Sequence, residues 1–131
     1  MNRAVVLVGH GSQIENAGEA LDRVCESLQK KEPGTIFRVG FLEITSPSIP
    51  EAVESCFAEG ADEVIVLPYF VQSGKHVNRH IPEIVSELTA HYPAKKIRLA
   101  RHLDFDERIV ALVGDRIREA RQGNLKLSQG T

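Results

Sequence analysis

Short apolar runs alternate along the chain with longer stretches in which apolar and polar residues recur in a helical rhythm. The apolar runs, at residues 4–9, 35–42, 64–67 and 96–100, have the length of β-strands. The first and third are continuous, as expected for strands that are covered on both faces of a sheet, whereas the second alternates in part and is typical of an edge strand. The pattern therefore predicts four strands.

The first two helical stretches lie between these runs. Apolar residues recur every three or four positions from about residue 15 to residue 31, which is the spacing of one helix face. The next helix starts at Ser46, which precedes a proline, or at Ser48, which opens a Ser-x-x-Glu capping box, and the sequence alone does not choose between them. Gly60 is a natural end for this helix.

The last two helices are expected after a loop over residues 69–78 and after the fourth strand. Pro82 must then lie in the first turn of the third helix, where its missing N–H costs little. Asp104 and Glu107 resemble a capping box for the last helix. The faces expected to be buried are Ile81, Ile84, Val85 and Leu88 in the third helix, and Ile109, Leu112, Val113 and Ile117 in the last.

Strict alternation of strands and helices predicts an α/β fold with one parallel sheet, right-handed crossovers and helices on both faces. We expect a three-layer sandwich with a four-stranded, flavodoxin-like sheet in the order 2-1-3-4. Residues 1–121 form a single domain in this interpretation, and residues 122–131 form a polar, flexible tail.

The residues that could bind a ligand or a metal follow the ends of the predicted strands. His10, Glu43, His76 and the pair Arg101-His102 follow the first to fourth strands in turn, and the carboxyl ends of parallel strands share one edge. In the order 2-1-3-4, His10 and His76 face each other at the switch point. Because imidazole is the commonest metal ligand among side chains, these two histidines and Glu43 suggest a divalent metal site.

Other interpretations of these residues remain open. Either histidine could cap a helix or bond a loop carbonyl, and a glutamate after a strand is often only a solvated charge. His80, four residues after His76, could be a third ligand or could fix the turn before Pro82. His91 is expected to be exposed at the far end of its helix.

Three cationic residues lie close in the sequence to the residues expected at this edge. Lys75, Arg79 and Arg101 could meet an anionic ligand there, although charged loops are usually only solvated. A dinucleotide site is disfavoured because Ile14 stands where the third glycine of G-x-G-x-x-G is required. A phosphohistidine motif is disfavoured because Gly9, and not arginine, precedes the histidine.

The composition indicates a globular domain and argues against a nucleic-acid-binding or membrane-spanning protein. The hydrophobic fraction of 42% and the charged fraction of 26% are typical of a globular domain. A formal net charge of −2 gives no global basic field for nucleic acid, and no apolar run has the roughly 18–20 residues of a membrane helix. Cys25 and Cys56 form no CxxC motif and no leader pattern opens the chain, so we expect a cytoplasmic protein with reduced thiols.

Several motifs together resemble the class II tetrapyrrole chelatases, most closely the small single-domain sirohydrochlorin chelatases of the CbiX type. In chain order the motifs are Val5–Ser12 (VVLVGHGS), Phe41-Leu42-Glu43 with Pro47-Ser48-Ile49, and Leu67–Phe70 (LPYF) with Gly74-x-His76-Val77 and Ile81-Pro82. The combination extends over nearly the whole chain.

The resemblance implies an ATP-independent enzyme that inserts Co(II), Fe(II) or Ni(II), cobalt being the first expectation, into sirohydrochlorin for cobalamin or siroheme synthesis. It implies His10 and His76 as metal-binding and catalytic residues, Glu43 as their acidic partner, and no cofactor beyond the substrate metal ion. It also implies a homodimer with the active site in its cleft. The family commonly has an acidic residue at the position of His80, so this chain departs from the pattern there.

The substrate implied by this resemblance carries many carboxylates, which would give Lys75, Arg79 and Arg101 a function in binding it. The alternative is a non-catalytic divalent-metal carrier that uses the same histidines without binding a tetrapyrrole.

Overall fold

A computed structural model of the chain describes residues 2–11 and 19–123, in which strands and helices alternate as expected. The elements are β1 (Arg3–Gly9), α1 (Glu19–Lys31), β2 (Ile36–Phe41), α2 (Ile49–Ala58), β3 (Glu63–Pro68), α3 (Lys75–His91), β4 (Lys96–Leu99) and α4 (Glu107–Arg121). The expected start of the first helix at residue 15, and the expected tail beyond residue 123, lie outside the described residues.

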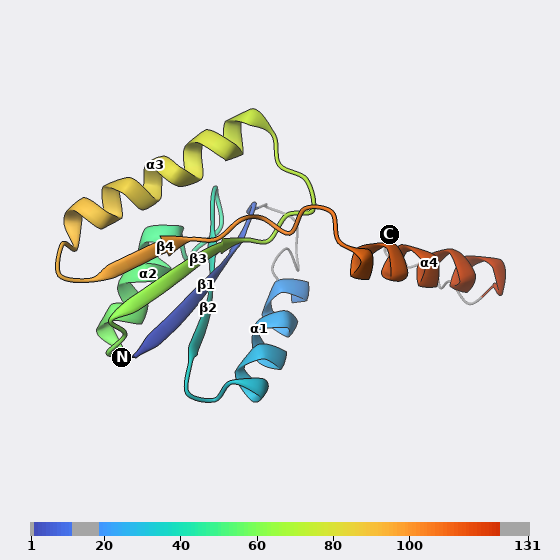
Figure 1. Cartoon of the computed structure of the whole chain (residues 1–131), viewed down its shortest axis with the longest axis horizontal. Helices are drawn as coiled ribbons and strands as arrows, with labels where there is room; N and C mark the ends of the chain where they lie inside the picture. The colour runs from blue at the N-terminus through green and yellow to red at the C-terminus, as the bar shows by residue number, and fades with distance from the viewer. Residues whose placement is uncertain (1, 12–18, 124–131) are drawn as a thin grey trace.

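The strands form one parallel sheet in the order β2-β1-β3-β4, which confirms the predicted topology. Helix α1 covers one face of the sheet, and α2 and α3 cover the other, as Figure 1 shows. The molecule therefore has the three predicted layers. Within the described residues, no helix combines the length and apolar character needed to cross a membrane.

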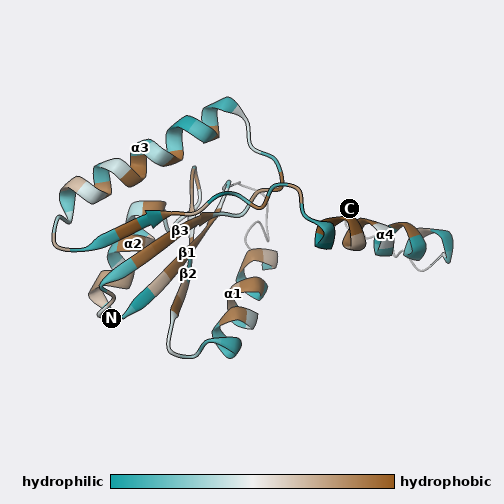
Figure 2. Ribbon diagram, in the orientation of Figure 1, coloured by the Kyte–Doolittle hydropathy of each residue, from teal (hydrophilic) through white to brown (hydrophobic). Residues whose placement is uncertain are grey.

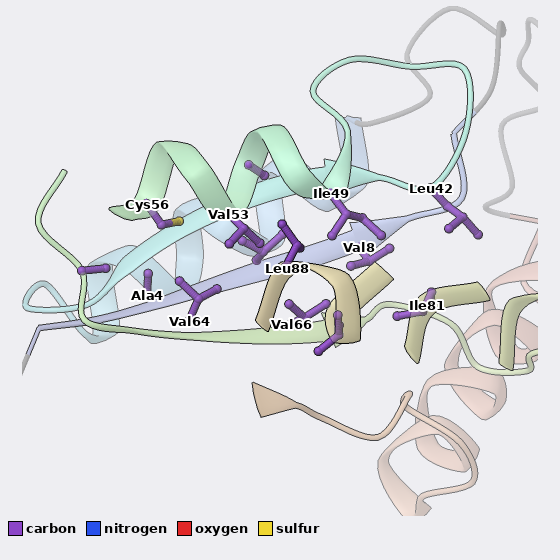
Figure 3. Packing of buried hydrophobic residues seen from close by; sticks show 14 residues of the cluster. Ala4, Val8, Leu42, Ile49, Val53, Cys56, Val64, Val66, Ile81 and Leu88 are labelled. Atoms are coloured by element: carbon purple, nitrogen blue, oxygen red, sulfur yellow. The ribbon is translucent and has the colours of Figure 1, made fainter. Parts of the chain in front are cut away.

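The larger core lies between the sheet and helices α2 and α3 (Figure 3). Val6 and Val8 of β1 and Val66 of β3 point into it and pack with Ile49 and Val53 of α2, all five being completely buried. Each such side chain contributes about 1.5–3 kcal/mol of hydrophobic stabilisation relative to exposure. This core anchors the two central strands, β1 and β3, whose ends carry the candidate site.

The smaller core lies under α1. Leu7 of β1, Leu21 of α1 and Phe41 of β2 are buried together, with α1 packed over β1 and β2. Residues in register on neighbouring strands point to the same face, so Ile65 and Leu67 of β3 also face this side. Leu67 packs against the cluster, whereas Ile65 is half-buried and belongs to neither core.

The structure shows which of the two candidate serines, Ser46 or Ser48, starts α2. Ser48 is the N-cap: its hydroxyl accepts a bond from the Glu51 N–H (3.2 Å), and the Glu51 carboxylate accepts one from the Ser48 N–H (2.8 Å). The capping box therefore sets the helix start, and Ser46 lies before it. Gly60 follows the helix with a φ of +103°, the left-handed conformation expected there.

Helix α3 begins earlier than predicted. It starts at Lys75, so Pro82 lies well inside the helix and the prediction that it occupies the first turn was wrong. Proline has no N–H to donate to the carbonyl of Asn78 one turn back, but the flanking residues Ile81 and Val85 are buried against the core. Packing of this face keeps the helix continuous through the proline, and His76 and His80 are already helical.

Helix α4 differs most from expectation. Asp106, and not Asp104, caps it, because the Asp106 carboxylate accepts a bond from the Arg108 N–H (2.9 Å). The predicted burial of its apolar face was also wrong: Leu112, Val113 and Ile117 are about half exposed and no residue of α4 is buried. The helix projects away from the sheet with apolar residues on its surface (Figures 1 and 2).

We expect Ser48→Ala to lower the free energy of unfolding by about 1 kcal/mol, because the mutation removes the acceptor for the Glu51 N–H. Urea unfolding followed by circular dichroism measures the change. Ser86→Ala is the matched control, since Ser86 is an exposed position inside α3 and alanine is favourable there. An equal loss of stability in both variants would contradict the capping role of Ser48.

Candidate functional site

The carboxyl ends of β1, β2 and β3 bring the candidate residues to one edge of the sheet. His10 directly follows β1, Glu43 lies two residues beyond β2, and His76 lies in the first turn of the helix that follows β3. Since these strands are parallel neighbours, their ends share an edge. The structure thus places all three residues at the predicted edge.

Main-chain pairing of β1 and β2 continues beyond the strands and holds His10 beside Glu43. The Leu42 N–H donates to the carbonyl of Gly9 (2.9 Å), and the Glu43 N–H donates to the carbonyl of His10 (3.0 Å). These bonds fix the backbone of both functional residues relative to each other. Their side chains need only rotate to approach a common ligand.

Glycine is required on either side of His10, because other parts of the chain lie close to both positions. Gly11 has a φ of +97°, and a Cβ atom placed on it would lie 1.8 Å from the Glu43 carbonyl oxygen. A Cβ atom on Gly9 would lie 2.9 Å from Leu21 Cδ2 and 3.0 Å from Phe41 Cε1. The sequence showed these glycines only as turn residues, whereas the structure shows that Gly11 allows the His10 and Glu43 segments to meet and that Gly9 leaves room for Leu21 and Phe41.

The aromatic ring of Phe70 lies beside the imidazole ring of His10. The two ring centroids lie 6.2 Å apart at an interplanar angle of 75°, an edge-on arrangement. The loop that carries Phe70 is held on both sides: the Tyr69 N–H donates to the Val8 carbonyl (2.9 Å) and the Phe70 carbonyl accepts from the Leu103 N–H (3.0 Å). The His10 imidazole therefore stands against a fixed aromatic ring while remaining exposed.

The start of α3 fixes His76. Gly74 is the N-cap and its carbonyl accepts from the Asn78 N–H (2.9 Å), which closes the first turn. The Ser73 hydroxyl donates to the Asn78 side-chain oxygen (2.5 Å) and braces this turn from outside the helix. His76 therefore projects from a helical turn of defined geometry, and His80 follows one turn later.

Glu43 and His76 approach each other across the edge. Glu43 Oε1 lies 3.8 Å from His76 Nε2, so they form an ion pair whenever the imidazole is protonated. Both side chains are substantially exposed, by 42% for Glu43 and 73% for His76, and an incoming ligand can reach them. The His76 and His80 rings stack with centroids 5.5 Å apart and an interplanar angle of 18°.

The structure separates the three candidate cations into two places. Lys75 and Arg79 line an open groove along the start of α3, which Glu83 and Pro82 also line. Arg101 lines a different cavity, of about 160 Å³, on the other side of Pro82. The residues around this second cavity are mostly apolar: Pro68, Val77, Ile81, Pro82, Leu99 and Ala100, with Ser73, Asn78, Arg101 and His102 at its polar positions. Sequence reasoning missed this cavity because its walls read as ordinary core positions.

Neither cysteine belongs to the site. Burial raises the pKa of the Cys56 thiol to about 11, and burial together with the nearby Asp22 carboxylate raises the pKa of Cys25. Both thiols are therefore protonated at neutral pH and pack as small apolar groups, as expected from their place on helix faces. Within residues 2–11 and 19–123, no three histidine, cysteine or acidic side chains already enclose a metal position. Metal binding at this edge requires side-chain rotation or further ligands.

The profile of a family described as CbiX matches residues 4–120, which is most of the chain. Among curated proteins, the sirohydrochlorin cobaltochelatase of Methanopyrus kandleri is 30% identical, over 89% of this chain and 96% of the relative. The sirohydrochlorin cobaltochelatase of Methanococcus aeolicus is 37% identical, over 63% of this chain and 57% of the relative. The sirohydrochlorin ferrochelatase of Bacillus subtilis is 27% identical, over 91% of this chain and 46% of the relative. The chain thus spans about half the length of these last two proteins.

Two solved structures also resemble this chain in fold. The sirohydrochlorin chelatase SirB from Bacillus subtilis subspecies spizizenii, in complex with cobalt, matches with a TM-score of 0.82 and 27% identity, over 91% of this chain and 51% of that one. A CbiX protein from Marinobacter aquaeolei matches with a TM-score of 0.78, over 92% of this chain and 98% of that one. At 22% identity the second match shows the common fold.

We expect Gly11→Ala to lower the free energy of unfolding by roughly 2–4 kcal/mol, since the new methyl group adds backbone strain and a clash with the Glu43 carbonyl. Chemical denaturation measures the loss. Gly34→Ala is the matched control, because a Cβ atom on Gly34 meets no atom within 4 Å. If Gly11→Ala were as stable as Gly34→Ala, the close approach of the two segments would not constrain the site.

Proposed function

The chain belongs to the CbiX family, and from this premise we propose that it is a sirohydrochlorin chelatase, which inserts a divalent metal ion into sirohydrochlorin. One observation carries the proposal. Two histidines and a glutamate, each following a different strand, meet at one sheet edge, with Glu43 Oε1 3.8 Å from His76 Nε2. Relatives of this chain named as cobaltochelatases and ferrochelatases support the choice of reaction.

Metal insertion exchanges the ion's water ligands for four ring nitrogens and releases two pyrrole N–H protons, with no change in oxidation state. His10 and His76 suit both parts of this reaction, because a neutral imidazole binds borderline divalent ions and also accepts protons near neutral pH. Both imidazoles are exposed at the edge and can reach an incoming macrocycle. Release of one proton to each histidine, and from there to water, balances the charge that the ion brings.

Glu43 acts through its position beside His76. At 3.8 Å its carboxylate can pair with the His76 imidazole once that ring has taken up a proton from the macrocycle. The backbone bond from the Glu43 N–H to the His10 carbonyl keeps the main chain of Glu43 beside His10. In this proposal Glu43 is the acidic partner of the pair, and the proton passes through it when His76 returns to the neutral form.

The carboxylates of the macrocycle would meet cations at the same edge. Lys75 and Arg79 flank the start of α3, whose first turn contains no acidic residue, so the positive end of the helix adds to their charge. Arg101 lies on the far side of Pro82 and would contact a different carboxylate. Spacing the cations on two sides of the helix start suits a ligand with carboxylates around its rim.

Cobalt is the first expectation for the metal, with iron and nickel as alternatives, because relatives include both cobaltochelatases and a ferrochelatase. No cofactor beyond the substrate metal is proposed. The compartment proposed is the cytoplasm, since Cys25 and Cys56 are free thiols. The second candidate function is a metal carrier, which would use the same imidazoles but leave the absorption spectrum of added sirohydrochlorin unchanged.

We expect His76→Ala to reduce the rate of Co(II) insertion by about a hundredfold or more, because it removes an ion ligand and a proton acceptor together. His10→Ala is expected to behave similarly. Absorption spectroscopy of sirohydrochlorin with Co(II), and anaerobically with Fe(II), follows the reaction, and circular dichroism checks folding. His91→Ala is the matched control at the far end of α3 and should react at the wild-type rate. A folded His76→Ala variant with the wild-type rate would remove His76 from the mechanism.

The protein is further proposed to act as a homodimer, and the exposed helix α4 supports this. Val110, Val113 and Ile117 lie on one stripe of α4 and are 46–51% exposed, which is unusual for an amphipathic helix of a single domain. The opposite side of the helix is charged and forms its own ion pairs, Arg116 with Glu119 and Arg118 with Asp115. The apolar stripe is therefore the side that needs a partner.

A second copy offers a matching surface. Among the described residues, helix α1 packs mainly over β1 and β2 and its cluster reaches Leu67 at the end of β3, so the rest of the β3–β4 half of that sheet face has little helix cover. Ile65 of β3 is half-buried there and belongs to neither core. Each copy thus has an apolar side of α4 that packs on nothing and a part of a sheet face with little helix cover. In a two-fold dimer, α4 of each copy can pack on that sheet face of the other copy, which covers both surfaces. The Bacillus subtilis ferrochelatase, of which this chain covers 46%, has about the length of two copies of this chain.

We expect Val113→Glu to convert the dimer to a monomer, because the new charge would have to be buried between the copies. Sedimentation velocity at micromolar concentration measures the mass. Ala111→Glu is the matched control: Ala111 is exposed on the charged side of the same helix, so its variant should remain dimeric. A wild-type protein that is monomeric and fully active would contradict the dimer.

A further inference from the structure

His80 lies near the edge, one helical turn after His76, and neither the comparisons nor the proposed mechanism gives it a role. We propose that His76 and His80 together form a two-imidazole chelating site on α3 that captures the divalent ion before its insertion. This inference rests on the proposed function for its purpose, but the metal site itself can be tested without any tetrapyrrole. His76 would then serve twice, first with His80 and afterwards with His10 and Glu43.

The geometry of the pair carries the inference. Both residues lie in the first turns of α3 and are four positions apart, so their side chains share one face of the helix. Their rings are nearly parallel, with an interplanar angle of 18° and centroids 5.5 Å apart. Two histidines at this helical spacing can point a nitrogen each at one ion, as in helical zinc sites.

The helical start of α3 at Lys75 is what makes chelation possible. Had the loop extended to residue 78, as the sequence suggested, the spacing of the two histidines would not have been set by a helix. Asn78 closes the first turn through the Gly74 carbonyl and the Ser73 hydroxyl, so the pair is held by bonds that do not involve the imidazoles themselves. The rings are therefore free to bind while their backbone is fixed.

The charges around the pair favour a cation on one side of the helix. Glu43 Oε1 lies 3.8 Å from His76 Nε2 and can supply a carboxylate oxygen. Glu83 and Glu87 follow His80 by three and seven positions, which places them on the same helix face, and both are exposed. Lys75 and Arg79 precede the histidines by one position each and lie about 100° around the helix, toward the neighbouring groove. Cation capture and carboxylate binding can thus occur on adjacent faces.

The donor set decides which ions would bind. Two imidazoles with a nearby carboxylate suit Co(II), Ni(II), Zn(II) and Cu(II), whereas Mg(II) and Ca(II) prefer sites made of oxygen ligands. In the described residues no third ligand is already in place around the pair, so water fills the remaining positions. Such a partly hydrated ion can exchange His80 and water for ring nitrogens while His76 keeps hold of it. In this transfer metal–ligand bonds are exchanged and the two pyrrole N–H bonds break, their protons passing through imidazole nitrogens that are not bound to the ion and from there to water.

The test titrates the full chain with Co(II), without tetrapyrrole, and follows the affinity by calorimetry. We expect His80→Ala and His76→Ala each to weaken binding by roughly tenfold or more, since even the loss of a hydrogen-bond partner of a metal ligand costs that much. Because a chelate needs both imidazoles, the double variant should be little worse than either single one. His91→Ala is the control and should bind as the wild type does. His80→Gln replaces His80→Ala if the alanine variant fails to fold.

A second readout identifies the ligands directly. Paramagnetic Co(II) should broaden the imidazole NMR signals of His76 and His80 at substoichiometric amounts and leave those of His91 sharp, while Mg(II) should have no effect. In the insertion assay, His80→Ala should raise the Co(II) concentration required for half the maximal rate and largely retain kcat, unlike His76→Ala.

The outcomes separate the two proposals. If wild-type protein binds Co(II) through both histidines but never alters the spectrum of sirohydrochlorin, the proposed function fails and the metal site remains. If insertion proceeds but His80→Ala binds Co(II) as tightly as the wild type, or if its effects and those of His76→Ala simply add, the chelating pair is overturned and the proposed function is unaffected.

Discussion

The candidate site depends on the continued pairing of the main chain beyond the ends of β1 and β2. The bond from the Glu43 N–H to the His10 carbonyl brings a carboxylate and an imidazole from segments about thirty residues apart to adjacent positions. Only a glycine at residue 11 permits it, since any Cβ there would lie 1.8 Å from the Glu43 carbonyl oxygen. The hydrophobic cores hold β1 and β2 in register. Two main-chain hydrogen bonds beyond the strand ends then extend this register to His10 and Glu43.

His76 reaches the same edge by a different route, and this explains why it was harder to place. Apolar periodicity predicted α3 well from Ile81 onward, because Ile81, Val85 and Leu88 pack against the larger core. It could not show that the helix starts at Lys75, because the first turn offers a single half-buried apolar residue, Val77, and is closed by a main-chain bond to Gly74. Pro82 reinforced the error, since proline is usually a marker of the first turn. The relation between His76 and His80 is therefore visible only in three dimensions.

Most of the fold could be predicted from the sequence because burial and turn chemistry agree in most segments. The apolar runs predicted the strands, and their alternation with helices predicted the parallel sheet. The order was expected by likeness to flavodoxin-like sheets, and the Ser48 capping box was one of two candidate starts for α2. For the site, the order of strands and ligands placed His10, Glu43 and His76 at one edge. It could not give the 3.8 Å contact between Glu43 and His76, nor show that Arg101 lines a cavity apart from Lys75 and Arg79, because these depend on where helices start and how side chains pack.

Helix α4 shows a limit of a different kind. Its amphipathic pattern correctly predicted a helix with an apolar side, and the error was to expect the sheet of the same chain to bury that side. Nothing in a helical periodicity of 3.6 residues distinguishes a surface of the same chain from one of another copy, because the hydrophobic effect is non-directional. What distinguishes them is the rest of the molecule: Ile65, on the face opposite α2 and α3, lies outside both cores and Val113 lies exposed on α4. Two unsatisfied surfaces in one chain can satisfy each other only if the chain folds back or if two chains meet, and the outward direction of α4 favours the second (Figure 1).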